Sequence, residues 1–565
     1  GWGDPDQATD VSNLPRLWPL IETFLGISAE HQTPFADPAK ITLPPSRASA
    51  ALLHDLSELL GADAVATDLE NRVLHAYGKS YRDLLRALRG EVDRAPDAVI
   101  FPNTHEEVEK VMALAQLHGV KLVPFGGGTN IVGAVEVSPT IEAPVITLSL
   151  RRMNRLLSLD AKSGVAVMQP GMLGPELEAA LNAQGFTLGH FPDSFEFSTL
   201  GGWLATRSAG MQSDTRGKIE DMVVSLRMVT PAGTLTTPTV PKAAVGPDLN
   251  QMAVGSEGAF GVITEATMRV YRLQEREYRG VLMPNFAAGV AFMHRCTREG
   301  IAPATMRLSN PLETRLGQAL KPPSTGWRRW LKTSVMTYLN RVRGFTEEHT
   351  CLLILGWEGG AKVARNRNRA LKLARSLGGF DAGREVGNTW YARKYDYPYL
   401  RDFLMRHGGM VDVAETSALW SNALPTYERI SEALGQALRR DEFPGYVGCH
   451  LSHSYAEGVC LYFTFAAARD ERDPLGQYLR TKRCSLEAIL AENAALSHHH
   501  ALGYEHLPWL ERYAGPTAIQ ALRGLKTALD PDNLCNPGKL IPGPESALDH
   551  FWPPTSSPRA PVEPK

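Results

Sequence analysis

The chain has 565 residues, of which 43% are hydrophobic and 21% are charged. These proportions are those of an ordinary globular protein, and they exclude a wholly disordered, collagenous or coiled-coil chain. The 59 Lys and Arg residues against 61 Asp and Glu residues leave a net charge of −2, so no global basic field exists to hold nucleic acid. We therefore expect no nucleic-acid partner.

The cysteines and the hydropathy pattern bear on location. Six cysteines occur without a C-x-x-C pair or zinc-finger spacing, which favours a reducing compartment over a disulfide scaffold. No apolar run reaches the roughly 18 residues of a membrane span. Neither a secretory signal peptide nor a peroxisomal address is visible. These observations predict a cytoplasmic protein.

The elements expected along the chain change in character near residue 91. The region before it is helical, as in residues 80–89, where Leu84, Leu85 and Leu88 form one stripe that Gly90 ends. Beyond it, short apolar runs that predict strands alternate with helical patterns, which indicates an α+β domain. The strands are expected at residues 98–101, 121–125, 145–150, 165–168, 223–230 and 262–270, and the clearest later one at 455–465.

Four regions are predicted from these patterns. They are a helical N-terminal region (1–90), an α+β domain (91–275), a second α+β domain (276–545) and a Pro- and Ser-rich tail (546–565) that is expected to be disordered.

Three segments carry the chemistry of a ligand site in the first α+β domain. The glycine cluster after the strand at 121–125 allows close backbone approach and a nest of N–H groups for an anion. It lacks the G-x-G-x-x-G spacing of a dinucleotide fold and the Lys of a P-loop, and a flexible turn remains the alternative. The first candidate set is Pro124, Phe125, Gly126, Gly127, Gly128, Thr129 and Asn130.

The other two segments mix small residues, hydroxyls and charged groups that suit a polar cofactor. Each alone is compatible with an ordinary loop, but three such segments in order are harder to dismiss. The second set is Asp193, Ser194, Phe195, Glu196, Phe197, Ser198, Thr199, Thr206, Arg207, Ser208 and Ala209. The third set is Glu257, Gly258, Ala259, Phe260, Gly261, Val262 and Ile263.

The order of these segments resembles the FAD-binding domain of the vanillyl-alcohol oxidase / para-cresol methylhydroxylase type. In that fold the glycine turn holds the FAD pyrophosphate, and the other segments line the ADP and the isoalloxazine. The resemblance implies an α+β protein with a two-subdomain FAD-binding domain (91–275), an α+β substrate (cap) domain and a helical N-terminal region. Because no His lies in segment 124–130, non-covalent FAD is expected.

A narrower resemblance is to the alkyldihydroxyacetonephosphate synthase family. It implies exchange of the acyl chain of acyl-dihydroxyacetone phosphate for a long-chain fatty alcohol, through a flavin N5 adduct and without net redox. The alternative is an FAD-linked oxidoreductase that acts on a 2-hydroxy acid or alcohol. Residues Cys535 to Lys539 resemble the C-terminal ending of such enzymes. The stretches that carry the narrower resemblance are 192–211, 219–233, 255–267, 302–310, 318–322, 414–420, 457–465 and 496–503.

The family resemblance also assigns the catalytic residues. It implies an acid/base role for Tyr462, catalytic roles for His498, His499 and His500, an active-site cation at Arg307 and phosphate binding by Arg401. A guanidinium fork suits a phosphate, and nearby histidines or an arginine are candidates to stabilise a phenolate.

Blander interpretations of the same residues remain open. Tyr462 is otherwise a strand core residue beside Phe463 and Phe465, and each arginine is otherwise one half of a surface ion pair. In an extended segment His498 and His500 share one face, so a metal site or a solvated polar loop are alternatives. No Asp, Glu or Cys stands at metal-motif spacing, and we predict no metal.

Residues 326–345 combine tryptophans with five cationic side chains, a composition that suits a helix lying on anionic lipid. A partly buried surface helix explains the pattern equally well. With the first interpretation, the protein contacts the inner membrane face peripherally. The sequence leaves the oligomeric state open, with a homodimer as one candidate.

Overall fold

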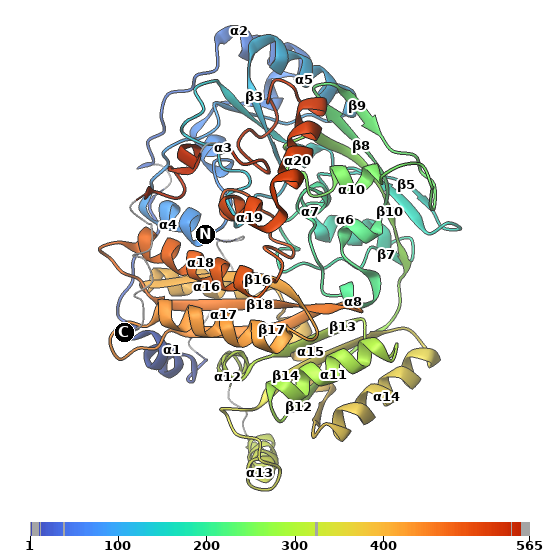
Figure 1. Cartoon of the computed structure of the whole chain (residues 1–565), viewed down its shortest axis with the longest axis vertical. Coiled ribbons are helices and arrows are strands. Elements are labelled where there is room, and N and C mark those ends of the chain that lie inside the picture. Colours follow the sequence, from blue (N-terminus) through green and yellow to red (C-terminus); the bar gives the residue numbers. More distant parts are fainter. Residues whose placement is uncertain are drawn as a thin grey trace.

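The computed structural model describes residues 2, 11, 13–37, 40–322, 326–543 and 545–554, without the side chains of 327–333, 361, 362, 545 and 546. Figure 1 shows two lobes, an upper one in blue to green and a lower one in green to orange. The upper lobe contains two sheets, and the red C-terminal helices lie against it. The lower lobe is built on one large sheet.

The first sheet of the upper lobe is mainly parallel. Strands β2, β4 and β3 run parallel, and β1 joins them antiparallel. Parallel strands need crossover connections, and α5 (His105–His118) supplies the one between β2 and β3, which lie on either side of β4. This helix begins after Thr104, whose hydroxyl accepts the N–H of Glu107, and ends at Gly119 with φ +64°. The strands are β1 (Val65–Ala66), β2 (Ala98–Ile100), β3 (Lys121–Phe125) and β4 (Val145–Ser149).

The second sheet of the upper lobe is antiparallel, in the order β5-β6-β10-β8-β9. The strands are β5 (Leu156–Asp160), β6 (Val165–Met168), β8 (Val223–Thr230), β9 (Gly233–Thr236) and β10 (Val262–Arg269), with a separate pair β7 (Phe186–Thr187) and β11 (Tyr271–Arg272). The other helices of the upper lobe are α2 (Ala50–Leu60), α3 (Leu69–Leu74), α4 (Tyr81–Arg89), α6 (Gly174–Asn182), α7 (Leu200–Thr206), α8 (Ser213–Arg216), α9 (Ile219–Met222) and α10 (Leu249–Ala253).

The end of the chain returns to the upper lobe. After α19 (Leu510–Ala514) and α20 (Pro516–Leu529), a short segment lies beside the edge strand β3. The N–H of Leu122 donates to the Leu534 carbonyl (2.8 Å), and the N–H of Asn536 donates to the Leu122 carbonyl (2.7 Å). Residues from the two ends of the sequence therefore share one sheet edge.

The lower lobe is a seven-stranded sheet in the order β15-β12-β14-β13-β17-β18-β16, antiparallel throughout. Alternate residues of a strand point to opposite faces, so Leu461, Phe463 and Phe465 pack into the core on one face, while Tyr462 and Thr464 face the other way. The strands are β12 (Arg276–Met283), β13 (Thr305–Ser309), β14 (Cys351–Glu358), β15 (Phe380–Gly383), β16 (Gly409–Leu419), β17 (Tyr446–Ser454) and β18 (Gly458–Ala468).

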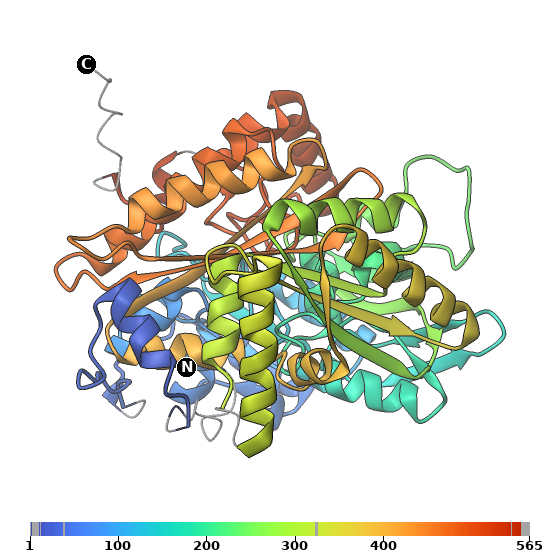
Figure 2. The same cartoon turned by 90° about the horizontal axis from the view of Figure 1, so that it is seen from below.

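Helices cover both faces of this sheet. The core face carries α11 (Phe286–Arg298), α14 (Ala361–Ser376), α17 (Ala423–Leu438) and α18 (Pro474–Ala491). The opposite face is covered in part by α12 (Pro311–Ala319), α15 (Arg384–Ala392), α16 (Tyr397–Arg406) and the N-terminal α1 (Leu17–Leu25). Figure 2, seen from below, shows α1 beside these elements.

Two sequence predictions differ from the structure. The late strand predicted at 455–465 is β18 (Gly458–Ala468), and Tyr455 lies at its preceding turn because the N–H of Tyr455 bonds back to the Gly458 carbonyl (2.8 Å). Residues 546–554 of the predicted disordered tail fold back instead: Phe551 and Trp552 are buried, and the Arg82 guanidinium lies over the Phe551 ring. Residues 555–565 lie outside the described part of the chain.

The predicted lipid-facing segment forms α13 (Gly326–Arg343), which projects from the lower lobe. Its tryptophan side chains lie outside the described residues, so membrane contact stays a prediction. Among the described helices, none combines the length and the apolar character that a bilayer crossing requires.

Candidate active site

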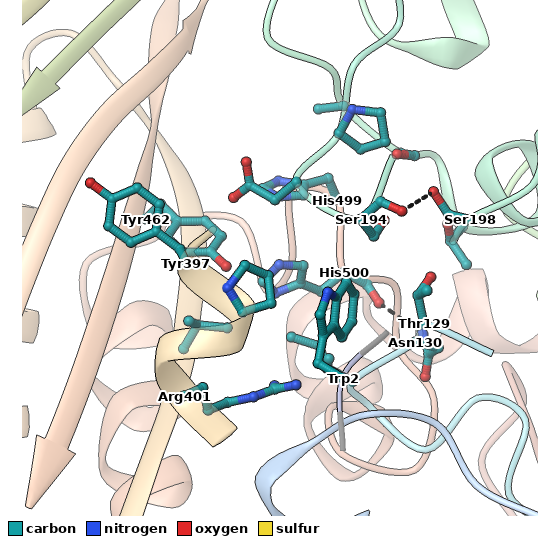
Figure 3. A pocket seen from close by; sticks show the side chains of 18 of the residues that line it. Trp2, Thr129, Asn130, Ser194, Ser198, Tyr397, Arg401, Tyr462, His499 and His500 are labelled. Carbon is teal, nitrogen blue, oxygen red and sulfur yellow. Dashed lines mark hydrogen bonds between the residues drawn. The ribbon is translucent and has the colours of Figure 1, made fainter. Parts of the chain in front are cut away.

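A cavity of about 360 Å³ lies between the lobes. Its walls come from the glycine loop after β3, the segment around α7, the helices α1 and α16, and the strands β13, β16, β17 and β18. In the view of Figure 3, Tyr462, Tyr397 and Arg401 lie on one side, and Thr129, Asn130, Ser194 and Ser198 lie on the other. His499, His500 and Trp2 stand between them.

The glycine loop is built to admit a ligand against its backbone. A Cβ on Gly127 would lie 1.7 Å from the Phe197 carbonyl oxygen, and Gly128 has φ +65°, so side chains are excluded at both positions. Among the described residues, none accepts a hydrogen bond from the backbone N–H groups of 127–131. Unpaired N–H groups bordering a cavity form an anion nest, and a pyrophosphate fits that donor set.

Most of the predicted cofactor residues line this cavity. They are Pro124, Phe125, Gly126, Gly127, Gly128, Thr129, Asn130, Asp193, Ser194, Ser198, Thr199, Thr206, Ser208, Ala209, Glu257, Gly258, Gly261 and Ile263.

Seven of the predicted cofactor residues do not line the cavity, because they support it instead. Phe195 stacks on Tyr395, Phe197 packs edge-on against Trp2, and Arg207 binds Gln251 (3.0 Å). The others are Glu196, which is half-buried, and Ala259, Phe260 and Val262, whose side chains are buried in the core.

One predicted cofactor residue joins the two lobes. The Glu257 carboxylate accepts the N–H groups of Leu502 and Gly503, both at 2.8 Å. Asn130 makes a second link, since its amide donates to the His500 carbonyl at 3.5 Å. The loop that carries the three histidines is thereby tied to the glycine loop across the cavity.

Tyr462 points into the cavity, which excludes the alternative that it is a core residue. Its ring lies between two imidazoles, with His450 at 4.8 Å and an interplanar angle of 22°, and His499 at 5.9 Å and 19°. Burial raises the pKa of its phenol well above the usual value, Asp193 and Asp412 raise it further, and Arg307 opposes them. Tyr462 is therefore a neutral phenol here, a proton donor rather than a phenolate.

The three histidines are held by one buried carboxylate. Glu415 Oε1 accepts the backbone N–H groups of His498 (2.9 Å), His499 (3.1 Å) and His500 (3.1 Å). It also accepts the hydroxyl of Ser497 at 2.7 Å. Burial opposes ionisation, yet the histidines and Ser497 keep the pKa of Glu415 well below its usual value. This carboxylate fixes the loop.

The loop places the histidines differently from the sequence expectation. His499 and His500 line the cavity, while His498 lies behind His499 and does not, because the chain bends around Glu415 instead of running extended. Burial lowers the pKa of His499 to about 3 and that of His500 to about 4. Both imidazoles are neutral near pH 7.

Four potential metal-ligand atoms gather here, from Glu415, Cys460, His498 and His499, all within 4.8 Å of one another. The Glu415 oxygens already accept backbone N–H groups, and the His498 Nε2 atom already bonds the Tyr455 hydroxyl (2.6 Å). An ion would have to break these hydrogen bonds, so the donor set favours a histidine loop held by protein groups alone.

The two predicted arginines differ in their surroundings. Arg307 forms a buried ion pair with Glu313 (2.9 Å), and Glu313 lies 3.2 Å from His450 Nδ1. Burial would raise the pKa of Glu313, but His450 and Arg307 lower it to about 2. Arg401 lines the cavity, and its Nε and Nη2 atoms are buried without a partner among the described residues. Unsatisfied guanidinium donors that face a cavity are suited to an anion.

Sequence reasoning missed His450, Glu313 and Glu415. His450 is the cross-strand partner of Tyr462, so a strand prediction at 446–454 would have found it. Glu415 is separated from its loop by more than 80 residues, and no local pattern signals it.

Comparisons with known proteins agree with this arrangement. The profile of the family "FAD binding domain" matches residues 96–238, and that of "FAD linked oxidases, C-terminal domain" matches residues 272–540. An alkyldihydroxyacetonephosphate synthase of Trypanosoma brucei brucei is 41% identical over 89% of this chain and 82% of its own length. The chain belongs to the alkyldihydroxyacetonephosphate synthase family.

Solved structures agree with the family. A structure of an alkyldihydroxyacetonephosphate synthase matches 93% of each chain with 37% identity and a TM-score of 0.81. The fold is shared more widely, as in p-cresol methylhydroxylase with substrate bound, at 15% identity and a TM-score of 0.67. The α+β fold and FAD as the cofactor are therefore confirmed, and the chain is an FAD-dependent enzyme of the alkyldihydroxyacetonephosphate synthase family. Non-covalent attachment of the flavin stays a prediction.

Proposed function

We propose that the enzyme exchanges the acyl chain of acyl-dihydroxyacetone phosphate for a long-chain fatty alcohol, giving an ether-lipid precursor without net redox. The observation that carries this proposal is the set of groups that line one cavity. It combines an anion nest for FAD, the Tyr462 and His499 pair, the unpaired Arg401 donors and an apolar arm.

The apolar arm supports a fatty chain as part of the substrate. It is walled by α1 through Ile21 and Leu25, by Leu404 of α16, and by Val411 and Ala466 of the sheet. Burial of each methylene of a chain contributes about 0.8 kcal/mol, so a long alkyl chain would bind such an arm strongly. A small hydroxy acid would leave it empty.

The phosphate group is assigned to Arg401. Its free donors suit a bidentate contact with a phosphate oxygen pair, and the Trp2 ring lies 5.8 Å from its guanidinium carbon. Arg307 is the second cation facing the cavity, already paired with Glu313. It adds positive charge without offering its full set of donors.

In this proposal, the base and the hydrogen-bond donor of the exchange are different residues. FAD would be held by residues 126–130, 198–199 and 257–258, and when bound it would supply the nucleophilic centre for the exchange. His499, neutral and at the cavity wall, takes the proton from the substrate carbon. Tyr462, held as a phenol, donates a hydrogen bond to the departing carboxylate, which takes the alcohol proton and leaves as the acid.

The test is an anaerobic incubation of the FAD-loaded protein with acyl-dihydroxyacetone phosphate and isotopically labelled hexadecanol. We expect label in an alkyl-dihydroxyacetone phosphate product without any electron acceptor, and loss of that label in Tyr462→Phe with FAD retained. If the wild-type protein, with flavin intact and substrates dissolved, incorporates no label but reduces an artificial acceptor with a 2-hydroxy acid, the proposal is wrong and the enzyme is an oxidoreductase.

A further inference from the structure

In the proposed exchange, on which this inference rests, the base His499 has to take up a proton at a buried position. His499 must hold a proton taken from the substrate carbon, yet burial already lowers its pKa to about 3. An imidazolium in this buried place would be costly, because an isolated buried charge is strongly destabilised. A base that accepts one proton and gives up another stays neutral and avoids that charge.

A chain of hydrogen bonds leads away from His499 on the side opposite the cavity. His499 Nδ1 lies 2.8 Å from His498 Nδ1, and His498 Nε2 lies 2.6 Å from the Tyr455 hydroxyl oxygen. Tyr455 is half-buried at the turn between β17 and β18, where the next two residues, Ala456 and Glu457, are exposed. The chain therefore runs from the cavity wall to an outer hairpin.

The three groups are held in this order mainly by contacts to their backbone, although His499 Nδ1 also lies 3.6 Å from Glu415 Oε2. Glu415 binds the backbone N–H groups of His498 and His499, and Lys218 Nζ donates to the His498 carbonyl at 2.5 Å. The ring of His453 stacks on His498 at 5.4 Å and 19°. Neutral imidazole has one donor and one acceptor nitrogen, which is the arrangement that passes a proton along a chain.

We propose that Tyr455 and His498 form a proton relay that connects His499 with solvent during the exchange reaction. In the outward transfer, His499 Nε2 takes the substrate proton and His499 Nδ1 gives its proton to His498 Nδ1. His498 Nε2 gives its proton to the Tyr455 oxygen, and the Tyr455 hydroxyl releases its own proton to water. All three groups end neutral, and both imidazoles end as the opposite tautomer.

The inward transfer, which returns a proton to the substrate carbon, runs the same hops in reverse and restores the starting tautomers. No net proton accumulates, and the proton at that carbon is exchanged for one from water. A purely structural hydrogen-bond network would support the loop equally well, so the test needs readouts that a structural role leaves unchanged.

The first test compares Tyr455→Phe with the wild-type enzyme in D2O with dilute buffer. The phenyl ring keeps the packing and removes the hydroxyl. We expect a rate of ether formation lower by about a hundredfold, the lower end of what a positioned proton transfer contributes. We also expect less deuterium at the substrate carbon in the product, unchanged KM values, and recovery of rate on adding imidazole buffer.

Tyr427→Phe is the matched control, since its hydroxyl accepts from Asn310 (3.2 Å) and lies in the packing under α17. It should keep the wild-type rate and deuterium content. A Tyr455→Phe enzyme with the rate and deuterium content of this control would overturn the relay.

A second test does not depend on turnover. In FAD-loaded protein with 15N-labelled histidines, saturation transfer from water should reach the ring N–H of His498 and His499 faster in the wild type than in Tyr455→Phe. Equal exchange in both proteins would refute the relay. If the wild type forms no ether product, the proposed function fails on that ground, and the histidine exchange still decides whether the three side chains pass protons.

Discussion

Replacement of Glu415 by Gln should release the histidine loop. The Glu415 side chain has 0% exposure. Its Oε1 accepts four hydrogen bonds, from Ser497 and the N–H groups of residues 498–500. Its Oε2 accepts from the His498 N–H at 2.7 Å. Glutamine offers one acceptor oxygen, and its NH2 group, a donor, would face a backbone N–H group, which is also a donor.

The expected loss of stability follows from the number of hydrogen bonds that Glu415 accepts. Hydrogen bonds to a charged group contribute about 1.5–3 kcal/mol and neutral ones about 0.5–1.5 kcal/mol, so each bond that loses its charge loses about 1 kcal/mol. Because neighbouring contributions add incompletely, we expect a total of about 3 kcal/mol in the free energy of unfolding. Displacement of His499 by about 1 Å should also lower the rate of ether formation about a hundredfold.

Two measurements check this, the thermal unfolding temperature and the rate of ether formation in the FAD-loaded protein. Glu457→Gln, a matched change at an exposed carboxylate, is the control and should alter neither. A Glu415→Gln enzyme with wild-type unfolding temperature and rate would refute the view that this carboxylate fixes the loop.

Three further predictions concern the cavity walls. Gly127→Ala should abolish FAD binding in a flavin fluorescence titration, because the added Cβ would lie 1.7 Å from the Phe197 carbonyl oxygen; retention of wild-type affinity would contradict the close-approach argument. Arg401→Gln should raise KM for the phosphorylated substrate about 10- to 100-fold with FAD affinity unchanged, since a charge-assisted contact is lost; an unchanged KM would remove Arg401 from the phosphate site. With pKa values of about 3 for His499 and about 4 for His500, lowering the pH protonates these rings only below about 5. The pH profile of kcat should then show no inflection near 6.5, and an inflection lost in His500→Gln would show that this ring titrates as an exposed histidine does.

The sequence predicted several elements of both lobes well because their signals are local. The strand, glycine turn and helix around residues 121–130 each follow from neighbouring residues, and the alternation in β18 separates Tyr462 from Phe463. The helix cap at Thr104 is equally local. Each of these depends on backbone preferences and side-chain period within about ten positions.

The parts that could not be predicted depend on distant contacts. His498 leaves the cavity wall because Glu415 bends its loop, and Phe551 is buried with its ring face against the Arg82 guanidinium. Helix α1 acquires its role by covering the sheet near Ala466, more than 400 residues away. Tertiary contacts of this kind have no signature in a local window.

The bond between Leu122 and the segment Leu534–Asn536 has a consequence for how the protein is made. During synthesis the chain emerges from its N-terminus, so the edge of β3 stays uncovered until the ribosome has passed residue 536. The Asn536 amide also donates to the carbonyls of Ala134 (2.9 Å) and Glu257 (2.6 Å), two residues near the glycine loop. We therefore expect a stop codon just before Leu534 to weaken flavin binding, which a flavin fluorescence titration of the truncated protein would measure.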